Sequence, residues 1–153
     1  MYRFAHDTLT EFMSSHGFEV TRHYLGLETA WRAEFTQGKG GRVMGVNSEM
    51  DALPGIGHGC GHNLIAISGI GIALAIKAAL QAHDIPGKVI LLGTPGKPFP
   101  ICRTEIVTDV EWTGEEGGGG KAILLQRGGY KEMDFCLMYA FPLQNLSPDS
   151  LSW

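Results

Sequence analysis

The segment from Gly55 to Leu64 reads "GIGHGCGHNL" and places three side chains that can bind metal ions, His58, Cys60 and His62, at alternate positions. Thiolate and imidazole groups are the usual ligands of zinc. In an extended chain, residues i and i+2 point to the same side, so Cys60 and His62 can reach one ion. The helix expected to follow favours the thiolate form of Cys60 at its N-terminus. The pattern predicts a metal site, with a buried cysteine beside two surface histidines as the alternative.

A second group of residues with chemical potential reads "EEGGGG" and runs from Glu115 to Gly120. Adjacent glutamates face different ways on a regular element. One of them can therefore bind metal while the other acts on a water molecule as general base. The four glycines let the backbone approach a small site closely. The alternative interpretation is a solvated acidic surface.

Two other chemistries fit these residues less well. A phosphate-binding loop of the pattern GxxxxGK would require glycine where Glu115 stands and serine or threonine where Ala122 stands. We therefore reject the phosphate loop. Cys60 and His62 could instead form a nucleophile and its base, but the sequence supplies no third group to orient the histidine. This second alternative ranks below metal binding.

Elements expected around these motifs alternate between helix and strand. Asn63 is expected to be the N-cap of a long helix that is apolar on nearly all sides and therefore covered by other elements. The predicted order is helix 5–16, strands 18–24, 30–35 and 42–50, the helix from 63, strand 88–94, helix 121–130 and a central strand 134–139. This order predicts an α/β fold whose mixed, largely parallel sheet is flanked by helices. Ligands of such sheets gather at the carboxyl ends of the strands, where both motifs are expected.

The composition limits the partners to be expected. The chain has 153 residues and a formal net charge of −4, which gives no reason to expect nucleic acid or an anionic membrane surface. The apolar run 64–76 is interrupted by Ser68 and stops at Lys77, so it is too short to span a bilayer. Three cysteines without a CxxC pair argue against a disulfide framework and predict a reducing, cytoplasmic location.

Three segments of the chain resemble the M-twenty peptidase family, a group of metal-dependent aminoacylases, carboxypeptidases and dipeptidases. They are "MDALPGIGHGCGHNLIA", "GKVILLGTP" and "EEGGGGKAILLQRGGYKEMDFCLM", which lie within residues 1–95 and 115–138. The likeness is greatest to the amidohydrolase and β-alanyl-dipeptidase-like branch. It implies an α/β catalytic domain with two divalent ions, zinc or manganese. It also implies hydrolysis of the amide bond of small N-acyl amino acids or dipeptides.

The resemblance also implies roles for individual residues. Cys60, His62 and Glu116 would be metal ligands, and Glu115 would be the general base that activates water. His58 fits the motif but is not a ligand in this branch. Asp51 falls where related members place an acidic residue beside the metals; its role and that of Glu49 are left open.

The chain departs from the family pattern in three respects. A histidine expected before a proline is replaced in "MYAFP", residues 138–142, and the family's lid domain, through which a homodimer would form, is missing. Residues 96–114 separate "GTP" from "EE", where the family has a single small residue. We interpret 96–114 as an anomalous insertion, derived from a retained intron, within a partial catalytic domain 1–142. Residues 143–153 are interpreted as an unstructured tail.

Two functions of different classes are compatible with these observations. The intact motifs favour a metal-dependent hydrolase represented by an incomplete chain. The replaced histidine and the missing lid favour a non-catalytic remnant that binds a metal or a partner without turnover.

Overall fold

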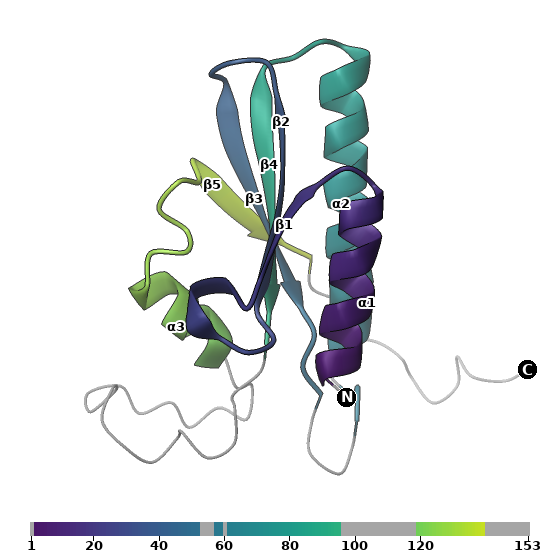
Figure 1. The fold of residues 1–153 in the computed structure, drawn as a ribbon, viewed down its shortest axis with the longest axis vertical. Helices are drawn as coiled ribbons and strands as arrows, with labels where there is room; N and C mark the ends of the chain where they lie inside the picture. The colour runs from purple at the N-terminus through teal and green to yellow at the C-terminus, as the bar shows by residue number, and fades with distance from the viewer. Residues whose placement is uncertain (1, 53–56, 60, 96–118, 140–153) are drawn as a thin grey trace, which may run out of the picture.

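The computed structural model of the chain describes residues 2–52, 57–59, 61–95 and 119–139. The elements follow the order α1 (Tyr2–Ser15), β1 (Glu19–Arg22), η1 (Tyr24–Gly26), β2 (Trp31–Gln37), β3 (Arg42–Glu49), α2 (His62–Ala82), β4 (Gly87–Thr94), α3 (Gly119–Gln126) and β5 (Phe135–Met138). Figure 1 shows these elements as one sheet with helices on both of its faces.

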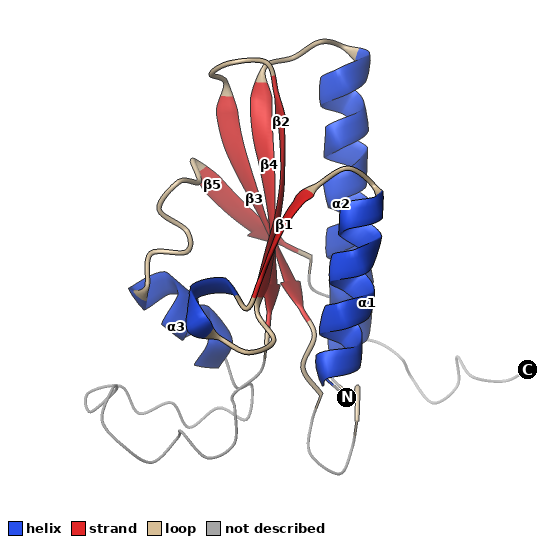
Figure 2. Cartoon of the chain, in the orientation of Figure 1, coloured by secondary structure: helices blue, strands red, loops and turns tan. Residues whose placement is uncertain are grey.

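The sheet is mixed, with strand order β1-β2-β4-β3-β5. β2 pairs antiparallel with β1 and β4, whereas β3 pairs parallel with β4 and β5. The three parallel strands therefore end at the same edge of the sheet, and α2 connects β3 to β4. In Figure 2, α1 and α2 lie on one face of the sheet and α3 lies on the other.

The main core lies between the sheet and helices α1 and α2. Trp31 is fully buried there, and its ring occupies the space beside Gly93 on the neighbouring strand. A Cβ atom on Gly93 would lie 2.1 Å from the Trp31 ring, so only glycine fits at that position. The other buried members of this cluster are Met13, Phe18, Ala33, Val46, Met50, Ala66, Ile70, Ala73, Val89 and Leu91.

Helix α2 approaches β3 closely because small residues face each other at the contact. A Cβ atom on Gly69 would lie 3.0 Å from the Cβ of Ser48, and the Ser48 hydroxyl donates to the Ala66 carbonyl at 3.1 Å. These contacts fix the N-terminal half of α2 against the carboxyl end of β3. They thereby determine where His62, the first residue of α2, is placed.

The opposite face of the sheet carries a smaller core beneath α3, built around Leu27, Ala30 and Leu124. A charged pair joins this layer to the sheet. Arg32 donates two hydrogen bonds to Glu132, at 3.1 and 3.0 Å, and its side chain is mostly buried. Hydrogen bonding to Glu132 raises the pKa of Arg32, which stays charged throughout the accessible pH range.

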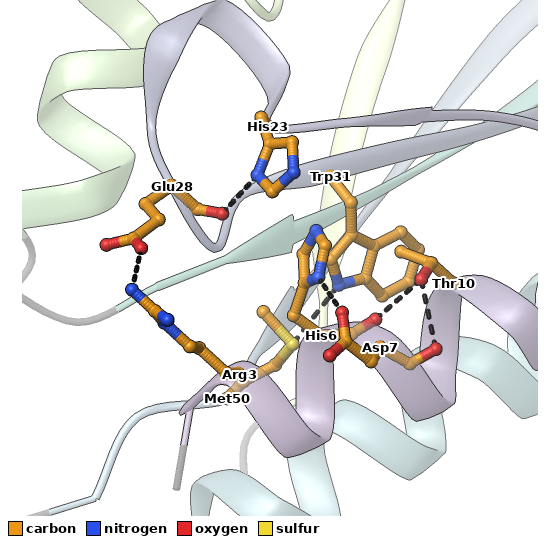
Figure 3. A network of polar contacts seen from close by, with 8 residues as sticks. All are labelled: Arg3, His6, Asp7, Thr10, His23, Glu28, Trp31 and Met50. Carbon is orange, nitrogen blue, oxygen red and sulfur yellow. Dashed lines mark hydrogen bonds and ion pairs between the residues drawn. The ribbon is translucent and has the colours of Figure 1, made fainter.

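A polar network ties α1 to the segment between β1 and β2 (Figure 3). The His6 and His23 rings stack with centroids 5.0 Å apart, and His6 Nδ1 lies 2.9 Å from the Asp7 carboxylate. Arg3 forms an ion pair with Glu28 in the same network. The network holds the N-terminal helix over the first two strands.

The structure confirms the predicted order and class of the elements, with three corrections. Gly61, rather than Asn63, is the N-cap of α2, because its left-handed backbone (φ 78°) lets the helix begin at His62. Helix α2 buries one face only, and Leu64 and Ile67 are exposed. The strand predicted as central, β5, lies at the edge of the sheet, and all four of its residues are exposed.

By length and composition alone, α2 could cross a membrane, with a mean hydropathy of 1.9 over its most apolar window. Its sequence is apolar on both faces. The contacts made by its buried residues with β3 and β4 are those of a helix packed on a sheet.

Candidate metal centre

The carboxyl end of β3 places two acidic side chains on one side of the chain. Glu49 is the last residue of the strand and Asp51 follows two positions later, so their side chains project in the same direction. The residue between them, Met50, is held by two contacts: its amide donates to the Thr94 carbonyl, and its sulfur accepts from the Trp31 indole at 3.2 Å (Figure 3). The buried core thus fixes the strand end that carries both carboxylates.

His62 points its ring at this pair of carboxylates from the first turn of α2. Its Nε2 lies 3.3 Å from a Glu49 oxygen, and its Nδ1 lies 2.8 Å from an Asp51 oxygen. The Glu49 side chain is 9% exposed and the His62 side chain 15%. His62 Nδ1 is buried, and its contact with Asp51 lacks the direction of a hydrogen bond, so this nitrogen has no hydrogen-bond partner in the described part of the chain.

The ring geometry fits one nitrogen directed at a cation and the other at an orienting carboxylate. Two ligands of one tetrahedral zinc ion lie about 3.4 Å apart when each bond is about 2.0–2.2 Å long. The separation of 3.3 Å between Glu49 and His62 Nε2 matches this spacing. Metal-binding histidines commonly turn their other nitrogen to a carboxylate, which is the position that Asp51 occupies.

The motif "EEGGGG" reaches the same edge of the sheet through its last glycine. A Cβ atom on Gly120 would lie 2.0 Å from the carbonyl oxygen of Pro95, the residue that follows β4. Only glycine therefore fits at this position, the second residue of α3. The next residue, Lys121, forms an ion pair with the second oxygen of Glu49.

A hydrogen-bonded layer supports the site from the face that carries α3. Tyr130 donates to the Asn47 amide oxygen at 3.0 Å, and the Asn47 nitrogen donates to Thr94 at 3.4 Å. Burial, with smaller contributions from Cys136 and Glu49, raises the pKa of Tyr130, so its hydroxyl remains a proton donor at neutral pH.

Not all of the predicted site residues can be compared with this geometry. Cys60, Glu115 and Glu116 lie outside the described residues, as do the insertion 96–114 and the tail 143–153. Among the residues that are described, no three His, Cys, Asp or Glu side chains are arranged to hold an ion. Of the predicted residues that are described, His62 lies beside Glu49 and Asp51, and His58 is exposed in the turn that precedes α2.

Sequence reasoning left the roles of Glu49 and Asp51 open and missed Lys121. The spacing i, i+2 at the end of a strand was a usable signal for the two acids. Lys121 is the lysine of the rejected GxxxxGK pattern, and a lysine directly after four glycines and two glutamates is itself a signal of an acidic site.

Comparison with known proteins gives two relatives named Xaa-Arg dipeptidase. The mouse protein is 39% identical over 151 residues and the human protein 36% identical over 155 residues. One of the subunits of p-aminobenzoyl-glutamate hydrolase from Escherichia coli is 30% identical over 148 residues. These matches cover 86–92% of this chain but only 27–31% of the relatives, so the chain spans less than a third of their length. No family model matches the chain.

Solved structures show the same fold. A dinuclear metal-binding peptidase of the M20 (M-twenty) family from Bacillus subtilis superposes with a TM-score of 0.60 at 20% identity, over 84% of this chain and 35% of that one. The resemblance to the M20 peptidases is confirmed. A protein from methicillin-resistant Staphylococcus aureus, described as a candidate aminohydrolase, superposes with a TM-score of 0.54 at 17% identity, over 85% of this chain and 34% of that one. The chain therefore has the fold of these two structures over most of its length.

Proposed function

We propose that the chain carries part of the active site of a metal-dependent hydrolase that cleaves the amide bond of dipeptides or N-acyl amino acids. The observation that carries the proposal is the placement of His62 between Glu49 and Asp51 at the carboxyl edge of the parallel strands. The three relatives are named as hydrolases of such bonds, which supports this class of reaction over a non-catalytic remnant.

We infer that His62 and Glu49 bind a divalent cation, zinc or manganese, and that Asp51 orients the histidine ring. When bound, such an ion polarises the carbonyl of the scissile amide and lowers the pKa of water. A second ion is supported by the dinuclear M20 peptidase of the same fold. Cys60 and Glu116 are proposed as further ligands on the basis of their motifs.

Asp51 and Glu115 would have separate roles in orienting the metal ligand and in transferring protons. Asp51 lies 2.8 Å from His62 Nδ1, and we propose that it accepts the proton of this nitrogen once a bound ion aligns the ring, which keeps Nε2 available as a ligand. Glu115 is proposed to take a proton from the attacking water and to return one to the leaving amine. Substrates to be tested are Xaa-Arg dipeptides and p-aminobenzoyl-glutamate, and the location is proposed to be cytoplasmic.

A zinc titration of the purified chain tests the proposed site. We expect His62→Ala to weaken zinc binding at least tenfold, because the substitution removes a direct ligand. His58→Ala is the matched control: it removes the same side chain from the exposed turn only four residues away. Equal zinc affinities in both variants and the wild type would contradict the proposal. Hydrolysis of Xaa-Arg dipeptides, where detected, should be lost in Glu115→Gln.

A further inference from the structure

The cation nearest to the proposed metal ligands is part of the protein itself. Lys121 forms an ion pair with Glu49 through one carboxylate oxygen, while the other oxygen faces His62 Nε2 at 3.3 Å. The ammonium group also lies 4.0 Å from the sulfur of Met138 on β5. One buried carboxylate is thus shared between a lysine and the proposed site of a divalent ion.

From this shared carboxylate we propose that Lys121 is a built-in counter-cation, which compensates Glu49 in the metal-free protein and lowers the affinity of the site for divalent ions. The inference rests on the proposed function, because it takes Glu49 as a metal ligand. It assigns Lys121 a positioning role and no contact with substrate.

Two effects of Lys121 on metal binding oppose each other. The ion pair holds the Glu49 side chain in one conformation. This favours metal binding, because the side chain then loses less conformational entropy when the ion binds. The ammonium also repels an incoming divalent ion at a separation of a few ångströms, beside a Glu49 carboxylate that is only 9% exposed, although the Lys121 side chain itself is 37% exposed. The repulsion between a divalent ion and the Lys121 ammonium at this distance costs more free energy than the restriction of the Glu49 side chain saves. The net effect of Lys121 is therefore weaker metal binding.

The burial of Glu49 explains why a lysine lies beside it. Glu49 is buried, and a buried carboxylate without a partner is costly. Lys121 supplies that partner before a metal arrives, so the strand end and the start of α3 can be held together without an ion. We expect a site that folds first and then binds metal reversibly, with an affinity that depends on Lys121.

The experiment is a zinc titration against a competing chelator, with Lys121→Met as the central variant. We expect Lys121→Met to bind zinc about tenfold more tightly than the wild type, whereas Lys121→Arg, which keeps the charge, should bind as the wild type does. Lys39→Met is the control for net charge, because it removes one positive charge from the exposed turn between β2 and β3, far from the site. In a Glu49→Gln background, the effect of Lys121→Met should disappear.

Thermal unfolding provides a second measurement on the same proteins. Without metal, Lys121→Met should unfold at a lower temperature than the wild type, and saturating zinc should remove or reverse the difference. If Lys121→Met does not fold, Lys121→Gln replaces it in both measurements.

The two proposals fail in distinguishable ways. Zinc binding by the wild type that depends on His62, with equal or weaker binding by Lys121→Met, would overturn the role of Lys121 and leave the proposed function intact. Absence of zinc binding from both the wild type and Lys121→Met would overturn both.

Discussion

The contact between α2 and β3 allows a test in which two glycines of one helix are compared. A Cβ atom on Gly69 would lie 3.0 Å from Ser48 Cβ and 3.3 Å from Leu91 Cδ1, whereas a Cβ on Gly71 would meet nothing within 4 Å. Replacing either glycine by alanine brings the same gain in helix propensity, about 1 kcal/mol. Only Gly69→Ala also adds a methyl group to a contact that is already closed.

The expected difference follows from these contacts. Gly71→Ala should raise the free energy of unfolding by about 1 kcal/mol. In Gly69→Ala the gain is opposed by overpacking, which typically costs about 1–3 kcal/mol, so that variant should be between neutral and about 2 kcal/mol less stable than the wild type. Each kcal/mol corresponds to about 2–4 °C in Tm for a chain of this size. Urea and thermal unfolding followed by circular dichroism would measure the difference.

The same pair of variants tests whether the contact positions the metal centre. His62 lies seven residues before Gly69 on α2, so displacement of the helix from β3 moves His62 away from Glu49. Zinc affinity should therefore fall in Gly69→Ala and stay unchanged in Gly71→Ala. Equal stabilities of the two variants would refute the packing argument, and equal zinc affinities would refute its link to the site.

Two further predictions concern the segment 97–114 and the carboxylate of Asp134. Removal of residues 97–114 should leave a folded chain, because Pro95 and Gly120 on either side of the segment are already in contact. Zinc binding through Glu116 should then be stronger in a zinc titration. An unfolded product would contradict the prediction. The hydrogen bond from the Val43 amide, and to a smaller extent the ion pair with Arg42, lowers the pKa of Asp134. The Asp134 carboxylate therefore stabilises the folded chain above about pH 4, and this stabilisation is lost as the pH falls through the lowered pKa. In Asp134→Asn, Tm measured between pH 6 and pH 2 should therefore fall less steeply than in the wild type.

Alternation and apolar runs were sufficient to predict the elements of the fold. β4 is a continuous apolar strand because both of its faces are covered, and this pattern is readable from the sequence alone. The N-cap of α2 could not be read in the same way, because Asn63 is a good capping residue by type. The decision depends on the left-handed backbone of Gly61, which no side-chain pattern reveals.

Position within the sheet was harder to predict than strand identity. The apolar composition of β5 is that of a buried strand, but its place at the edge depends on which strands pair, and pairing is a long-range property. In the site, too, local features were predictable and long-range contacts were not. Local spacing predicted that His62 belongs to a metal centre, whereas the ion pair between Lys121 and Glu49 joins residues 72 positions apart and required the folded chain.

The charges around Glu49 explain why the site can exist without metal and yet favour a cation. Glu49 and Asp51 contribute two negative charges, and Lys121 returns one positive charge. With His62 neutral, the group retains one uncompensated negative charge in a place of low exposure, which is an unfavourable condition for a purely structural cluster. A divalent ion between Glu49 and His62 would overcompensate this negative charge by one. The negatively charged ligands proposed from the motifs, the thiolate of Cys60 and the carboxylate of Glu116, would offset this excess positive charge, which is the reason to expect them to act together with His62 and Glu49.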